Sequence, residues 1–290
     1  MVRHRLDEPT RQQWAASATR LLRGAFPEPP EEVTAWPAAA RLLPHVLAVA
    51  DHPGSQAGEP EGIALLLNQA ARYLWGRAEH TRAESLHERA VAICEAHLGP
   101  DHPTTAWCLN SLAVVLHDQG DLDGARTLFE RALAIREARL GPDHRITVWS
   151  LNSLANVLRD QGDLDGARTL HERALAIFEG RSGPDHPDTA WSLDGLGVVL
   201  RAQGDLAGAR TLFERALAIY EARLGRDHPW VATSLDNLAN VLHDQGDLEG
   251  ARALHERALA IFEGRLGPNH PDTVRSRKLL ATVVTALENR

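Results

Sequence analysis

GPDHPTTAWCLNSLAVVLHDQGDLDGARTLFERALAIREARL, residues 99–140, decides the fold of this 290-residue chain, because the stretch returns three more times. Its period is 42 residues, which separates Gly99, Gly141, Gly183, Gly225 and Gly267 from one another in turn. A fixed period of this size is typical of stacked repeat arrays. One unit of such an array cannot bury its apolar face alone, so neighbouring units are expected to share a continuous core.

Within each unit the spacing predicts two helices joined by a tight turn. The first helix is expected from about Thr104 to Asp118, and Gly120 supplies the left-handed residue that a helix C-terminus prefers. Asp121 is then placed to cap the second helix, which carries its own apolar stripe. No stretch shows the period-two alternation of a strand, so the sequence predicts an all-α fold.

The residues at these positions resemble the tetratricopeptide repeat. The spacing that carries the resemblance is that of Leu109, Ala113, Leu116, Gly120, Ala125, Phe129 and Ala132. The 42-residue unit, with its LGPDHP linker and SLNSLA first helix, is similar to the kinesin light chain type. The resemblance implies a right-handed superhelical solenoid of antiparallel helix pairs. It also implies that the first helices line a concave groove, which holds a protein or peptide ligand.

The array is expected over residues 56–271, in about five units. The first unit, residues 56–98, is degenerate, since Ala78 replaces the glycine of the turn. Terminal repeats are often atypical in this way. Residues 272–290 are predicted to form a C-terminal capping helix, because polar side chains take the place of the usual apolar ones there.

Residues 1–55 do not match the repeat and are predicted to form a helical cap or linker. A helix from about Glu31 to Ala50 is expected to be kinked or split by Pro37 and Pro44. The segment also resembles the helical region that precedes the repeats in bacterial NB-ARC/STAND-type ATPases. Under this alternative the chain is the sensor portion of a signalling ATPase, without the nucleotide-binding domain.

Composition excludes several classes of protein. The formal charge of −8 argues against nucleic acid as the partner, because phosphate binding requires clustered positive charge. No apolar run approaches the roughly 18 residues that a membrane span needs. Two cysteines are too few for a disulfide framework, and the N-terminus has no signal-like apolar segment, so a cytoplasmic setting is expected.

No catalytic or cofactor-binding signature is present, and the sequence predicts a non-enzymatic protein without cofactors. A histidine recurs in every linker, which suggests a metal site at first sight. Equivalent residues of successive repeats lie at least about 8–10 Å apart, whereas metal ligands must come within about 2.3 Å of one ion. We therefore expect these histidines to satisfy helix starts. They are His102, His144, His186, His228 and His270.

Four rows of side chains lie opposite the apolar stripe of the first helices, and we predict that they line the ligand groove. The first row is Trp107, Trp149 and Trp191, and the second is Asn68, Asn110, Asn152, Asp194 and Asp236. The third row includes Asn156 and Asn240, and the fourth is His117, Arg159, Arg201 and His243.

Each row suggests a kind of contact. Tryptophan and arginine often dominate binding energies, by about 2 kcal/mol or more each. Amide side chains can bond both the N–H and the C=O of an extended peptide, and Arg159 and Arg201 can bind carboxylates. The alternative is that each tryptophan packs over a connection and each amide bonds within its own repeat. Self-association of the array through an end also stays open.

Overall fold

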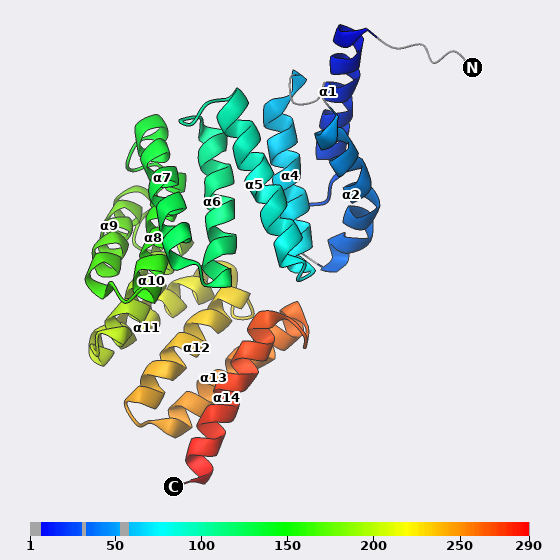
Figure 1. Cartoon of the computed structure of the whole chain (residues 1–290). Helices are drawn as coiled ribbons and strands as arrows, with labels where there is room; N and C mark the ends of the chain where they lie inside the picture. The colour runs from blue at the N-terminus through cyan, green and yellow to red at the C-terminus, as the bar shows by residue number, and fades with distance from the viewer. Residues whose placement is uncertain (1–6, 31–32, 53–57, 290) are drawn as a thin grey trace. The chain divides into compact units, whose positions relative to one another are not determined.

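The computed structural model describes residues 7–30, 33–52 and 58–289 (Figure 1). Regular structure in these ranges consists of 13 α-helices and one short 3₁₀ helix, which confirms the all-α prediction. The chain divides into two compact units, Met1–Ser150 and Leu151–Arg290.

The helices follow one another in pairs. The first unit holds α1 (Glu8–Ala25), η1 (Val33–Ala35), α2 (Trp36–Asp51), α4 (Pro60–Gly76), α5 (His80–His97), α6 (Pro103–Gln119) and α7 (Leu122–Leu140). The boundary between the units falls inside α8 (Arg145–Asp160). The second unit continues with α9 (Leu164–Ser182), α10 (Pro187–Ala202), α11 (Leu206–Leu224), α12 (Pro229–Asp244), α13 (Leu248–Leu266) and α14 (Pro271–Glu288).

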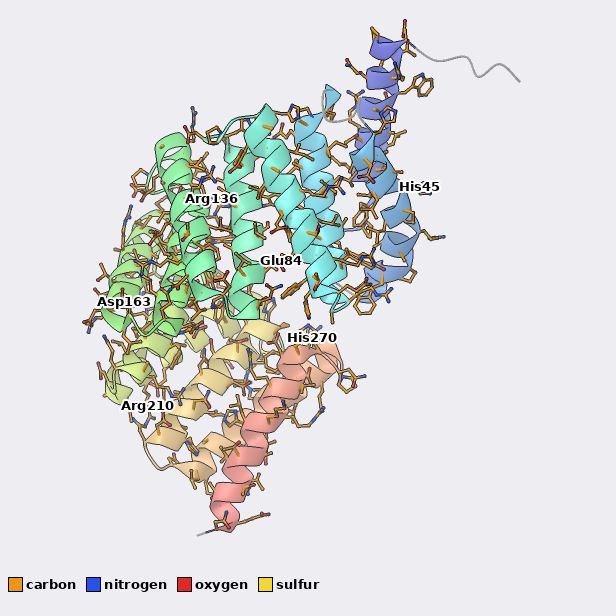
Figure 2. The ribbon with its side chains drawn as sticks, in the orientation of Figure 1. His45, Glu84, Arg136, Asp163, Arg210 and His270 are labelled. Atoms are coloured by element: carbon orange, nitrogen blue, oxygen red, sulfur yellow. The ribbon has the colours of Figure 1, made fainter. Side chains whose placement is uncertain are left out.

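Turns and caps form as the sequence predicts. Gly120 ends α6 with a left-handed φ of 87°, and the carboxylate of Asp121 accepts a hydrogen bond from the Gly124 N–H at 3.0 Å. Every linker histidine caps the helix after it, because its Nδ1 accepts from the backbone N–H two residues on. His270 caps α14 in this way, and Figure 2 labels its place at the start of that helix.

The degenerate first repeat keeps the turn without the glycine. Ala78 adopts a φ of 60°, and among the described residues it is the one non-glycine with a positive φ. The left-handed region costs an L-residue roughly 1–2 kcal/mol. The packing of α4 against α5 therefore imposes the repeat's turn on a residue that does not favour it.

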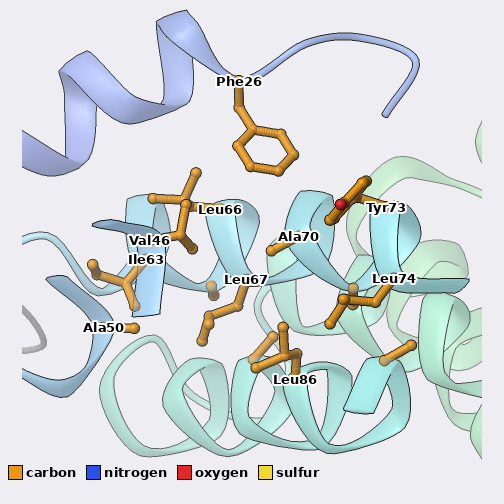
Figure 3. Packing of buried hydrophobic residues seen from close by; sticks show 14 of the residues in the cluster. Phe26, Val46, Ala50, Ile63, Leu66, Leu67, Ala70, Tyr73, Leu74 and Leu86 are labelled. Atoms are coloured by element: carbon orange, nitrogen blue, oxygen red, sulfur yellow. The ribbon is translucent and has the colours of Figure 1, made fainter. Parts of the chain in front are cut away.

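The N-terminal helices pack on the first repeat. Both α1 and α2 contact α4, and Phe26 and Val46 join the cluster of buried side chains around Leu66 (Figure 3). These helices therefore cover apolar side chains of α4, and their role as a cap or linker stays a prediction. The predicted boundary at residue 55 lies outside the described residues.

Of the two expected effects of the prolines, a split is absent from residues 36–51, and a kink stays a prediction. A 3₁₀ turn precedes α2, which begins at Trp36 with Pro37 in its first turn, where the missing N–H leaves no bond unmade. Pro44 lies inside α2, and the helix continues past it to Asp51.

In the second unit the core alternates small and large side chains. Ala216 and Ala258 are fully buried, and they allow the helices to approach closely. Tyr220 and Phe262 fill the space beside them. Among the described residues no helix is long and apolar enough to cross a membrane.

Candidate binding face of the first helices

The asparagine and aspartate row lies deeper than the sequence suggested. Asn68, Asn152, Asp194 and Asp236 are at most 8% exposed, and Asn110 is half-buried. Each buried member reaches the first helix of the next repeat. Asn152 donates to Ser192 Oγ at 3.0 Å, and Ser234 donates to Asp194 Oδ2 at 2.7 Å. The row therefore joins neighbouring repeats inside the stack, and its use as the lining of a ligand groove stays a prediction.

Histidines on the second helices complete this row in three repeats. The Nδ1 atoms of His87 and His171 bond Asn68 and Asn152, the latter pair at 2.7 Å. Burial lowers the pKa of His87 to about 4 and that of His171 to about 3, so both rings are neutral at physiological pH. His255 makes the same contact with Asp236, at 2.8 Å.

The repeat containing Phe129 satisfies its row in another way. Phenylalanine takes the place of the histidine there, and Arg136 on α7 (Figure 2) donates to Asn110 Oδ1 at 3.0 Å and to Ser150 Oγ. Burial lowers the pKa of Arg136 to about 10, so the guanidinium stays charged at physiological pH. The polar partner has moved seven residues along the second helix, which keeps it on the same face.

The repeat containing Phe213 lacks both partners. Tyr220 takes the place that Arg136 has in the earlier repeat, and Asp194 Oδ1 has no hydrogen-bond partner among the described residues. Burial raises the pKa of Asp194 to about 7. Burial, and then the Asp194 carboxylate, also raise the pKa of Tyr220. This repeat thus contains a buried acid to which no described basic side chain donates a hydrogen bond.

The tryptophan row has mixed surroundings. Trp107 is partly buried against the core of the first unit, whereas Trp149 is 41% exposed and lies under the Arg145 guanidinium, 4.6 Å from its ring centroid. Trp191, in the second unit, is partly buried and lines a hollow with Thr233 from the next first helix.

The charged row is paired with acids of its own repeat or of the next one. Arg159 lies 2.8 Å from Asp160, and Arg201 donates to Asp244 Oδ2 at 2.6 Å. His243 also contacts Asp244, and His117 contacts Asp118. To bind a carboxylate of a ligand, Arg159 or Arg201 therefore has to exchange its present acidic partner for that carboxylate.

A hollow of about 330 Å³ opens on the second unit, and we call it the second-unit hollow. Most of its lining comes from the first helices α8, α10, α12 and α14, and His171 and Tyr220 reach it from second helices. Five of the predicted groove residues line it, namely Trp191, Asn152, Asp194, Asn156 and Arg159. Asn240, Arg201, His243 and Asp236 belong to the same unit but do not line it.

The first unit has a smaller hollow of about 280 Å³. Its lining includes the predicted Asn110 together with Trp75, His87 and the exposed Val114. Asn68, Trp107 and His117 do not line it.

Sequence reasoning missed several lining residues of the second-unit hollow, among them Trp230, Tyr220 and Arg275. Trp230 stands three residues before the predicted tryptophan row, where the preceding repeats carry Thr104, Ile146 and Asp188. Tyr220 belongs to a second helix, whereas the groove was predicted to be lined by first helices. The sequence signal that could have identified Trp230 and Tyr220 was that both differ from the residues at the equivalent positions of the other repeats.

Metal ligands do not converge anywhere in the described part of the chain: it contains no group of three His, Cys, Asp or Glu side chains that could hold an ion. Cys94 and Cys108 are both buried, with their sulfur atoms 3.6 Å apart. The absence of a metal site or cofactor stays a prediction.

The family follows from the match of the repeats. The tetratricopeptide repeat family model matches residues 62–138, 110–179, 147–222, 197–264 and 230–290. The chain belongs to the tetratricopeptide repeat family. These matches begin at residue 62, and the resemblance of residues 1–55 to the region before the repeats in NB-ARC/STAND-type ATPases stays a prediction.

Solved tetratricopeptide structures of the kinesin light chain type resemble this chain. A putative kinesin light chain from Podosopora anserina, described as having nearly identical TPR-like repeats, is 26% identical with a TM-score of 0.58, over 71% of this chain and 97% of that chain. A point-substituted form of that protein gives 26% and 0.59, over 71% and 96%. BtubC (BKLC) from P. vanneervenii shares the fold, with 22% identity and a TM-score of 0.60 over 90% and 94%. The comparison with curated proteins found no match.

Proposed function

We propose that this chain is a non-enzymatic scaffold that binds an extended protein segment along the face formed by its first helices. The observation that carries the proposal is the second-unit hollow, because four successive first helices contribute to its lining. Tetratricopeptide repeat proteins bind protein partners, and stacked repeats present the same helix face again and again.

The chemistry of the hollow suits a peptide. Trp191 offers a large apolar contact, and Asn156 and Thr233 add polar groups beside it. Aromatic and arginine side chains carry most of the energy at protein interfaces, while the contacts around them exclude water. The mixture of apolar walls and a few polar groups is typical of binding pockets.

The test is selection of peptides from a random twelve-residue library on the whole chain, followed by affinity measurement on variants. Trp191→Ala should weaken a selected peptide about 30-fold, as expected for a tryptophan at the centre of an interface. Trp14→Ala is the matched control, because Trp14 is 67% exposed on α1 and lies outside the hollow. Failure to select any peptide, or equal affinity of the two variants, would contradict the proposal.

The sensor of an NB-ARC/STAND-type ATPase is the second candidate function. One observation favours it: α1 exposes Trp14 and Leu21, seven residues apart, as a helix does at a contact with another domain. Trp14→Glu combined with Leu21→Glu separates the two candidates. The scaffold proposal expects peptide binding to be unchanged in this double variant, whereas a partner held through α1 would be lost.

A further inference from the structure

Two buried hydrogen-bond acceptors of the second-unit hollow have no partner among the described residues. They are Asp194 Oδ1 and His171 Nε2, and both side chains line the hollow. The Nδ1–H of the neutral His171 ring donates to Asn152 Oδ1, so Nε2 carries the lone pair. Because buried polar atoms are nearly always bonded, two open acceptors beside one hollow indicate a donor that enters from outside.

Internal bonding does not explain why residue 194 is an acid. Its one bond is to Ser234, and Asn152 makes the equivalent bond to Ser192 with an amide. Asp236, one repeat later, also has one unbonded oxygen, but its other oxygen bonds the imidazole of His255, and it does not line the hollow. Residue 194 is therefore a carboxyl group beside the hollow, at a position where an amide would make the same internal hydrogen bond.

The cations that line the hollow are already paired. Arg159 contacts Asp160 at 2.8 Å, and Arg275 contacts Asp272 at 3.0 Å. A buried carboxylate without a cation is costly, and an incoming cation would remove that cost.

The ring of His171 packs against Gly195, the residue that follows Asp194 in the sequence. A Cβ at residue 195 would lie 2.4 Å from the His171 ring, so the glycine lets the imidazole lie directly against α10. The corresponding residues of the other repeats are Ser111, Ser153 and Asn237, which shows that the repeat fold itself does not require glycine here.

Aromatic rings form the walls of the hollow. Trp191, Trp230 and Tyr220 all line it, and the rings of Tyr220 and Trp230 lie 5.5 Å apart. Ammonium and guanidinium groups are attracted to the faces of such rings. The walls also suit the aliphatic stem of a long basic side chain.

We infer that the second-unit hollow binds the side chain of a lysine or arginine of the bound peptide, with its N–H groups donating to Asp194 and His171. An ammonium group has three donors and a guanidinium five, so either supplies both acceptors. The volume of about 330 Å³ is within the range of small-ligand pockets. This inference rests on the proposed function, since the side chain is delivered by a peptide on the first-helix face.

The experiment is the same random peptide selection, read for residue preference, on the wild type, Asp194→Asn and Asp236→Asn. Asparagine occurs at this repeat position in Asn110 and Asn152, so both variants are expected to fold, which circular dichroism checks. Asp236→Asn is the matched control, with the same change one repeat further on and away from the hollow.

We expect the wild type and Asp236→Asn to enrich lysine or arginine at one peptide position, and Asp194→Asn to lose that preference while still selecting peptides. A lysine peptide should bind Asp194→Asn about 30-fold more weakly. Peptides selected without any basic preference, or with one that survives in Asp194→Asn, would overturn this inference and leave the scaffold proposal standing. Selection of no peptide would overturn both.

A second variant tests the mechanism without removing the acid. Phe213→His places an imidazole at the position from which His255 bonds Asp236, so it should occupy Asp194 and abolish the basic preference. An unchanged preference in this variant would contradict the role of the open oxygen. Spermidine is titrated in parallel. If spermidine bound only when Asp194 is present, and the selected peptides showed no basic preference, the hollow would be assigned to a free amine. That result would overturn the peptide inference.

Discussion

Two successive repeats of the second unit differ in the hydrogen bonding of the buried polar residue on their first helix. The first contains Asn152, His171 and Phe178, and the equivalent residues of the next are Asp194, Phe213 and Tyr220. In the first repeat the ring of His171 fills space and bonds the amide. In the second, the ring of Phe213 fills the same position without offering a bond, and one oxygen of Asp194 is left open.

The comparison shows that one second-helix position decides which residue can hydrogen-bond the buried polar row. Where this position is histidine, the row is bonded inside its repeat. Where it is phenylalanine, the row depends on the residue seven places further on. In the repeat that contains Phe129, Arg136 hydrogen-bonds Asn110. In the repeat that contains Phe213, Asp194 Oδ1 has no partner among the described residues, Tyr220 included.

The largest effect expected from this comparison is a pH dependence of stability. Burial raises the pKa of Asp194 from 3.8 to about 7, so the folded chain holds this proton more tightly than the unfolded chain. The destabilisation is absent below about pH 4, grows as the pH rises and is complete above about pH 7. Asp194→Asn should therefore gain stability over the wild type across this window, by up to about 4 kcal/mol. Urea unfolding at pH 4.5, 6 and 8 measures the difference.

His171 acts in the opposite direction. Burial lowers its pKa from 6.5 to about 3, so its contribution to stability is complete above pH 6.5 and is lost as the pH falls toward 3. His171→Phe should remove this loss on acidification. If the stability of the wild type, Asp194→Asn and His171→Phe changed with pH in the same way, the buried Asp194 and His171 side chains would not have the opposite effects predicted here.

A smaller effect follows from removing the histidine in two repeats where its partner is an amide in one and an acid in the other. His255→Phe leaves the Asp236 carboxyl with Ser276 alone and should cost about 3 kcal/mol, because an acid loses its buried partner. His171→Phe leaves a neutral amide and should cost about 1.5 kcal/mol. Phenylalanine occupies this position at Phe129 and Phe213, so the fold accommodates its volume.

Urea unfolding at pH 7.5 compares the two variants, and His255→Phe with Asp236→Asn is the check on the cause. Replacing the acid should recover part of the loss, since the charge is then gone. Equal losses in the two single variants would mean that packing alone accounts for the histidines.

Local features of the fold could be read from the sequence because each depends on a few adjacent residues. Gly120 needs only its left-handed backbone, and Asp121 needs only the N–H groups that follow it, so both are determined within one turn. The linker histidines cap helices for the same reason. Recurrence at 42 residues then extended each local prediction to the whole array.

The orientation of the asparagine row could not be read in this way. Helical spacing gives the angle between residues on one helix, but not how deeply the next helix covers them. Asn152 is buried because α9 and α10 both reach it, through His171 and Ser192. The open oxygen of Asp194 depends in turn on Phe213 and Tyr220, which lie 19 and 26 residues further along the chain.

The smallest expected effect tests whether a residue that departs from the repeat pattern changes stability only through its own turn. Ala78 adopts a φ of 60° where Gly120 adopts 87° in the next repeat, and a Cβ at Gly120 would meet nothing within 4 Å. The difference between the two turns is therefore a backbone preference with no steric clash. Ala78→Gly should stabilise the chain by about 1 kcal/mol, and Gly120→Ala should destabilise it by a similar amount. Urea unfolding measures both variants, and a double variant with both changes should return to the wild-type stability because the turns lie in separate repeats. Destabilisation by Ala78→Gly would mean that the methyl group of Ala78 makes a contact worth more than its backbone strain, and that this repeat is built differently from the others.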